Sequence, residues 1–138
     1  MHELKRSKKI FEEVKIGDEI LTVNISADTA LKEFNKNFNA VIAAENTLKQ
    51  LADGADVDIE QAADAYSQAV IGLLKLLFGG ENTAKILTFY ENNYVEMVNE
   101  VFPFVLDVIL PKVKELMDEE KQKLAARYNR SQRRKLGL

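Results

Sequence analysis

The residues that most often carry enzyme chemistry are nearly absent from this chain. Its one histidine is His2, close to the N-terminus, and it has no cysteine. A Ser–His–Asp triad, a histidine dyad and a multi-histidine metal site are therefore excluded, as are disulfides and thiolate zinc sites. The sequence contains no glycine-rich phosphate-binding motif. Its one pair of adjacent glycines, Gly79-Gly80, has the form of a helix stop. We predict no catalytic, cofactor-binding or metal-binding residues, and no enzyme activity.

Carboxylates are the remaining chemical groups, and four of them gather around one short loop. Asp53, Asp56, Asp58 and Glu60 loosely resemble a calcium site. Their spacing lacks the alternating oxygen ligands, the glycine at the sixth position and the glutamate at the twelfth that an EF-hand requires. We favour an ordinary acidic loop in which Asp58 caps the following helix.

Charge is divided unevenly along the chain. Residues 16–120 carry 19 acids and seven bases, whereas residues 121–138 carry seven bases and no acid. Residues 1–15 have five bases and three acids, so the three parts contribute +2, −12 and +7 to the net charge of −3. A basic segment without acids of its own needs an acidic partner. The layout therefore favours an interaction or assembly protein over an enzyme.

The basic segment has two possible partners, nucleic acid phosphates and an acidic protein surface. It offers one aromatic residue, Tyr128, to stack on bases, and the acidic remainder of the chain would repel a polyanion. We therefore favour protein docking or a disordered solubilising tail, and expect no nucleic acid partner. The candidate partner-binding residues of this segment are Arg127, Arg130, Arg133, Arg134 and Lys135.

The elements that position these groups begin with a β-hairpin over residues 10–25. Gly17-Asp18 predicts a two-residue type II′ turn, in which the glycine takes the positive φ. Pairing outward from this turn sets Val14 opposite Leu21 and brings five apolar side chains to one face: Ile10, Val14, Leu21, Val23 and Ile25. We expect this face to lie on helices and cap the core. Pairing of a hairpin edge with a partner strand is the less favoured alternative.

Helices follow the hairpin. Ser26 or Asp28 can cap the first, whose apolar stripe ends near Asp53-Gly54. The second ends at Gly79-Gly80, and a short third helix ends before Asn92-Asn93. The stripe of the first helix has three- and four-residue spacing and comprises Leu31, Phe34, Phe38, Val41, Ile42, Leu48 and Leu51.

The last helical pattern runs from about Tyr94 to Arg127 and contains Pro103 and Pro111. Each proline removes a backbone donor and crowds the preceding turn. We expect either one long, kinked helix or, preferably, two helices with a break near Pro103. Nearly every residue of Val101–Leu110 is apolar, which predicts a helix in the core or at an oligomer contact. The candidate partner-binding residues here are Phe102, Phe104 and Leu106.

We therefore predict a mainly α fold, with an N-terminal β-hairpin, a bundle of four to five helices and a basic disordered tail. Residues 1–9 are a flexible N-terminus, 10–126 a single domain and 127–138 the tail. Apolar residues become rarer after Met117, so the last helix should project past the body. No apolar run reaches the roughly 20 residues of a membrane span, and the N-terminus lacks the apolar region of a secretory signal, so we expect a soluble protein.

Several short motifs follow the hairpin in a recognisable order: Phe78–Asn82, Tyr90–Tyr94, Val101–Phe104, Leu110–Lys112 and Asn129–Arg134. In this order the chain resembles small proteins encoded among the tail morphogenesis genes of tailed bacteriophages and prophages, which are similar to tail assembly chaperones. The resemblance implies a largely helical protein in the cytoplasm of the bacterial host. It also implies that the protein coats the long tape-measure protein and hands it to polymerising tail-tube subunits, often as an oligomer.

These observations lead to one main hypothesis and two alternatives. The main hypothesis is a non-enzymatic assembly chaperone that binds a tape-measure or tail-tube type of protein through apolar helical faces and the basic tail. One alternative is a nucleic-acid-associated regulator that uses Arg127–Lys135. The other is a structural component that remains in the virion.

Overall fold

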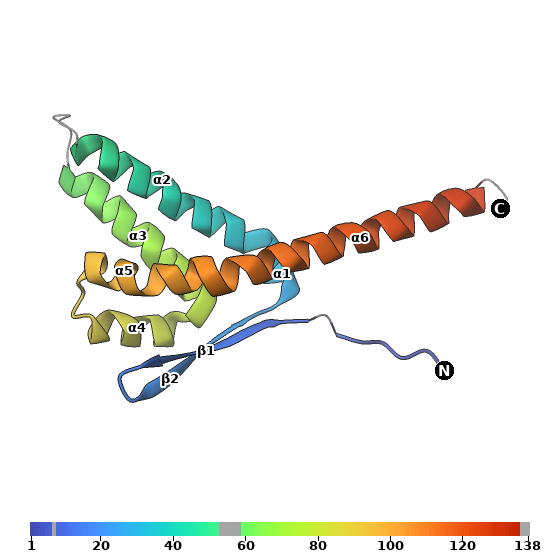
Figure 1. Cartoon of the computed structure of the whole chain (residues 1–138), viewed down its shortest axis with the longest axis horizontal. Coiled ribbons are helices and arrows are strands. Elements are labelled where there is room, and N and C mark those ends of the chain that lie inside the picture. Colours follow the sequence, from blue (N-terminus) through green and yellow to red (C-terminus); the bar gives the residue numbers. More distant parts are fainter. Residues whose placement is uncertain (7, 53–58, 136–138) are drawn as a thin grey trace.

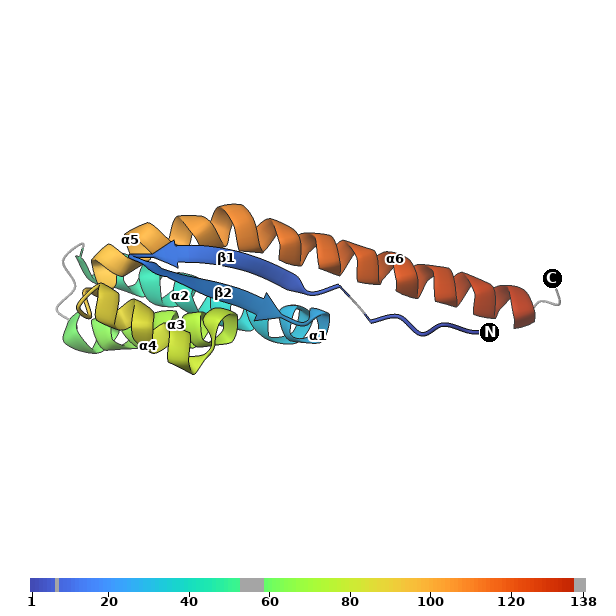
Figure 2. The same ribbon diagram turned by 90° about the horizontal axis from the view of Figure 1, so that it is seen from below.

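The chain folds as an N-terminal β-hairpin lying on a group of helices, and the last helix extends far past the hairpin and the other helices (Figures 1 and 2). The computed structural model describes residues 1–6, 8–52 and 59–135, without the side chains of residues 52 and 131–135. The predicted mainly α fold with an N-terminal hairpin is confirmed.

The hairpin consists of β1 (Ile10–Ile16) and β2 (Glu19–Ile25), paired antiparallel in the predicted register with Val14 opposite Leu21. Gly17, the first central residue of the turn, has a φ of +60°, and Asp18, the second, has a negative φ. A type II′ turn requires this combination. The predicted inner face is buried or half-buried along both strands, and β2 packs on the helix that spans residues 59–78. The hairpin therefore covers one side of the helical core.

The first helical segment contains α1 (Ala27–Thr29), a π-helical stretch η1 (Ala30–Phe34) and α2 (Asn35–Ala52), which follow one another without a break. Of the two predicted caps, Ser26 is the N-cap, and its hydroxyl accepts a hydrogen bond of 3.2 Å from the backbone N–H of Thr29. This bond satisfies one of the free amide groups at the start of the helix.

The next two helices are α3 (Ile59–Phe78) and α4 (Gly80–Phe89). They are separated at the predicted glycine stop, where Gly79 has a φ of +83°. After α4 the chain turns through Glu91 and Asn92, which both have positive φ. The predicted Asp58 cap of α3 lies outside the described residues.

The last segment is one uninterrupted helix made of α5 (Tyr94–Phe104), the π-helical η2 (Val105–Ile109) and α6 (Leu110–Lys135). The preferred prediction of a break near Pro103 is therefore wrong, and the alternative of a single long helix is correct. The π segment lies between the two prolines, and the Leu110 N–H donates to the carbonyl of Val105, five residues earlier. A wider turn of this kind lets a helix continue past the missing donor and the crowding ring of Pro111.

The hydrophobic core lies where the inner face of the hairpin, α2, α3 and the α5–η2 segment meet. Phe34 and Val41 come from the first helical segment, Leu74 from α3, and Met97 and Ile109 from the last helix, and all five are at most 2% exposed. Their positions agree with the apolar stripes of the sequence. Both α2 and α5 pack on this shared core, and this packing fixes α5 beside α2.

The C-terminal half of α6 projects from this body, as predicted, and each of residues 121–130 is exposed. Helix α6 continues to Lys135, through most of the segment 127–138 that was predicted to be a basic tail. Residues 121–135 contain no glycine or proline and many strong helix formers, which explains why the helix continues in spite of its positive charge. Within the described residues, no helix is long and apolar enough to cross a membrane.

Candidate functional site

An open, largely apolar groove lies between α2 and α5, with one contribution from α3. It has a volume of about 370 Å³. We call it the α2–α5 groove, and its lining residues are Glu45, Leu48, Lys49, Tyr66, Val98, Asn99, Phe102, Pro103 and Leu106. Two of the predicted partner-binding residues, Phe102 and Leu106, are therefore brought together here.

The apolar wall of the groove follows from the helical spacing of Val98, Phe102 and Leu106, which are four residues apart and lie on one face of the α5–η2 segment. Phe102 is half-buried, and its ring stacks on that of Phe38 with a centroid distance of 5.8 Å and an interplanar angle of 1°. Leu106 retains 39% of its exposure. Phe102 and Phe38 both pack against the hydrophobic core, so the core supports this wall of the groove. At Leu106 the groove is open to solvent.

Phe104, the third predicted residue of this stretch, does not line the groove. Its ring lies 6.4 Å from that of Phe78, between centroids, in a tilted arrangement within the fold. Phe102 and Phe104 are two residues apart, so they point to different sides of the helix. Sequence reasoning treated them as equivalent because the whole stretch is apolar.

Charged groups give the groove an acidic surrounding. On its α2 rim, Lys49 pairs with Glu45 at 3.1 Å. Burial, and next the negative charge of Glu45, raises the pKa of the Tyr66 phenol above its ordinary value. On the other side, α5 carries two acids, Glu96 and Glu100, and no base, and both acids are exposed.

The same negative field acts on Tyr90, which follows α4. Burial, then Glu100 and then Glu96, raises the pKa of its phenol above the ordinary value. The N-terminal half of α3 adds two further exposed acids, Glu60 and Asp64. The end of the body that contains the groove is therefore predominantly negative.

The projecting half of α6 is the second candidate surface, and it is basic. Among the predicted partner-binding residues, Arg127 and Arg130 are exposed on it. Arg133, Arg134 and Lys135 belong to the same helix, but their side chains lie outside the described part of the chain. Two large apolar side chains accompany the bases, since Leu124 is 57% and Tyr128 64% exposed.

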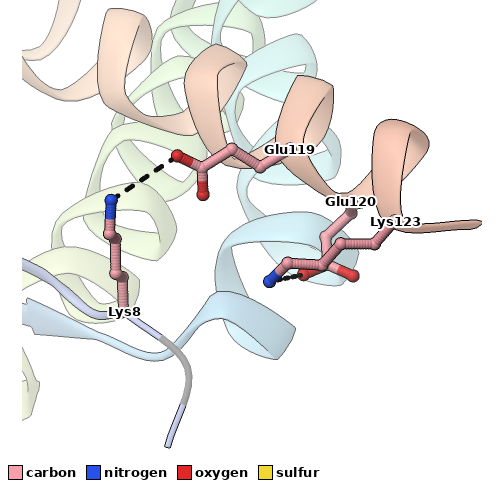
Figure 3. A network of polar contacts seen from close by, with 4 residues as sticks. All are labelled: Lys8, Glu119, Glu120 and Lys123. Atoms are coloured by element: carbon pink, nitrogen blue, oxygen red, sulfur yellow. Dashed lines mark hydrogen bonds and ion pairs between the residues drawn. The ribbon is translucent and has the colours of Figure 1, made fainter. Parts of the chain in front are cut away.

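Where α6 leaves the body, the charge of its side chains changes from predominantly negative to positive. Glu119 pairs with Lys8 at 3.7 Å and Glu120 with Lys123 at 3.4 Å (Figure 3). Nearer the body, Lys112 bonds to Glu12 of β1. Exposed pairs such as the first two contribute at most about 1 kcal/mol each, so the Lys8–Glu119 pair orients the N-terminal segment only weakly.

Two other surface hollows contain none of the predicted residues. One, of about 540 Å³, lies between the hairpin turn and α4, where Lys85 pairs with Glu19 at 3.5 Å. The other, of about 500 Å³, lies between the N-terminal segment and α6 and is lined by Lys8 and Leu116 among others. Both are open hollows whose lining residues form no converging set of catalytic groups.

Metal chemistry has no visible site in the described ranges, where no group of three or more His, Asp or Glu side chains is placed to hold an ion. Of the acidic loop, Asp53, Asp56 and Asp58 lie outside those ranges, and Glu60 is exposed on α3.

No family model matches the chain, and neither a curated protein nor a solved structure matches it. A shallow apolar groove and a basic helix are suited to binding another macromolecule.

Proposed function

We propose that this protein is a non-enzymatic assembly chaperone in the cytoplasm of the bacterial host, and that it binds a helical segment of a tape-measure type of protein in the α2–α5 groove. One observation carries the proposal: Leu106 is 39% exposed in an open groove, and two further apolar residues of its lining, Val98 and Phe102, lie on the same helix face. An amphipathic client helix would cover this apolar surface with residues at three- and four-residue spacing.

The charge distribution supports a second, weaker contact with the client. Arg127 and Arg130 are exposed on a helix that stands away from the acidic body, where they can attract an acidic client segment at a distance from the acids that would repel it. Such exposed charges increase the rate of association more than the final affinity. The groove therefore provides most of the binding energy in this proposal.

Co-purification tests the proposal. A tagged tape-measure fragment encoded beside this gene is mixed with the purified protein at micromolar concentration, and a stable complex is expected. A matched variant truncated at Tyr128 should bind more slowly and remain bound. If neither the intact nor the truncated chain forms a complex, the proposal is wrong.

The nucleic-acid alternative makes a different prediction. Binding to DNA or RNA would weaken steeply between low and physiological salt, because each phosphate contact releases counterions, and deleting residues 130–135 would abolish it. Client binding through the groove would persist under both conditions. Retention of the protein in purified virions would instead favour the structural alternative.

A further inference from the structure

The projecting half of α6 is largely exposed to solvent, with the N-terminal segment near one side of it. All of its residues from 121 to 130 are exposed, including Leu124 and Tyr128, which are four residues apart and so lie on one face. A helix of about 15 residues is only marginally stable by itself in water. A stable structure for this segment therefore benefits from a partner that covers that face.

The α2–α5 groove has the complementary properties. Its wall is made of Val98, Phe102 and Leu106, and the elements around it carry the exposed acids Glu96 and Glu100. The apolar pair on α6 is surrounded by exposed bases instead: Lys121, Lys123, Arg127 and Arg130. Apolar surface thus meets apolar surface, and the surrounding charges are of opposite sign.

A chain cannot fill its own groove in this way. The groove lies at the end of the body where α2 ends and α5 begins, and α6 leaves the body in the opposite direction (Figure 1). The segment from Tyr94 to Lys135 is one uninterrupted helix, so it offers no loop on which α6 could fold back. The occupant must therefore come from another molecule.

We propose that the α2–α5 groove binds the projecting α6 of a second copy of this chain, with Leu124 and Tyr128 inserted beside Phe102 and Leu106. Each copy offers one groove and one α6, so two copies can exchange both helices in a closed two-fold dimer, or successive copies can form a head-to-tail chain. The contact uses the same groove as the proposed function and requires no client. A client helix would then have to displace the neighbouring copy.

A complementation experiment with the full chain tests this pairing in the absence of any client. One variant carries Leu124→Ala and Tyr128→Ala, which removes the α6 anchors and keeps the groove. The other carries Leu106→Asp, which places a charge in the groove and keeps α6. Neither variant should associate with itself, whereas an equimolar mixture should give a 1:1 complex and nothing larger by light scattering and sedimentation.

The experiment includes the wild-type chain and one control variant, and two results would overturn the proposal. The wild-type chain should exceed the monomer mass between micromolar and millimolar concentration, and should approach it as salt is raised. Ile20→Ala, at a 62% exposed position on β2 outside the groove, should associate like the wild type. A monomeric wild type at low salt would overturn the proposal. So would self-association of the Leu106→Asp variant, because helix α6 would then pair with something other than the groove.

The experiment distinguishes a failure of the proposed pairing from a failure of the proposed function. A wild-type chain that associates and yet captures no tape-measure fragment supports the pairing and contradicts the chaperone proposal. A wild-type chain that stays monomeric and captures the fragment does the reverse. Association that disappears on nuclease treatment also overturns the pairing, since nucleic acid would then be bridging the basic helices.

Discussion

Replacing Leu106 with alanine tests whether the α2–α5 groove binds the client. Fully burying a leucine side chain contributes about 1.5–3 kcal/mol. Leu106 is 39% exposed, and a client that covers this part gains about 0.6–1.2 kcal/mol. We therefore expect the Leu106→Ala variant to bind a tape-measure fragment about threefold to eightfold more weakly, as measured by titration calorimetry.

The same substitution also removes packing inside the fold, so its effect on stability must be measured separately. A fully buried Leu→Ala change costs about 2–5 kcal/mol, and the partly buried Leu106 should cost about 1–3 kcal/mol. A domain with the usual 5–15 kcal/mol of stability remains folded after such a loss. Urea unfolding followed by circular dichroism checks this.

Two control variants complete the experiment. Leu106→Met keeps the volume and the apolar character, so it should bind like the wild type. Ile20→Ala removes the same number of carbon atoms from a 62% exposed position on β2, outside the groove, and should also bind normally. Equal affinity of Leu106→Ala and wild type would refute the assignment of the groove as the client site.

Three further predictions concern the fold. Gly17→Ala should destabilise the chain by about 1–2 kcal/mol in urea unfolding, because Gly17 has a φ of +60° and an added Cβ would lie 3.4 Å from the Phe89 ring; a wild-type midpoint would contradict this. Phe34→Ala should cost about 3–5 kcal/mol in the same assay, since Phe34 is fully buried, and a loss below 1 kcal/mol would be inconsistent with that position. Tyr66 has a raised pKa in the folded state, so its stabilising effect is complete below pH 10.0 and is lost as the pH rises through the folded-state value. The free energy of unfolding should therefore fall more steeply at alkaline pH in the wild type than in Tyr66→Phe, and parallel curves would disprove it.

Local signals in the sequence were sufficient for most of the fold. The Gly17-Asp18 turn sets the register of the hairpin, because its length leaves one way to place the apolar residues on a common face. Gly79 and the Asn92-Asn93 pair mark helix ends that the structure confirms. These features depend on a few neighbouring residues, so a single sequence contains them.

The break near Pro103 was predicted wrongly because two effects compete there. The sequence shows that Pro103 and Pro111 each lack a donor, but it does not show that a π turn at Val105–Ile109 lets the helix continue. At the C-terminal end, the helix propensity of residues 127–135 acts against the mutual repulsion of their positive charges, and α6 continues to Lys135.

The groove could be predicted only in part. The four-residue spacing of Val98, Phe102 and Leu106 was a usable signal that sequence reasoning did not isolate from the surrounding apolar residues. Leu48 and Tyr66 could not be found in this way, because they come from α2 and α3 and reach the groove only through tertiary packing. Phe104 was chosen for its size and is turned toward Phe78 instead.

Hydrogen–deuterium exchange on the protein with and without a tape-measure fragment tests the central claim most directly. If the α2–α5 groove is the client site, backbone amides of residues 45–49 and 98–106 should exchange more slowly in the mixture, whereas those of the hairpin should be unchanged. Protection confined to the hairpin, or no protection at any position in a mixture where the complex has formed, would contradict it.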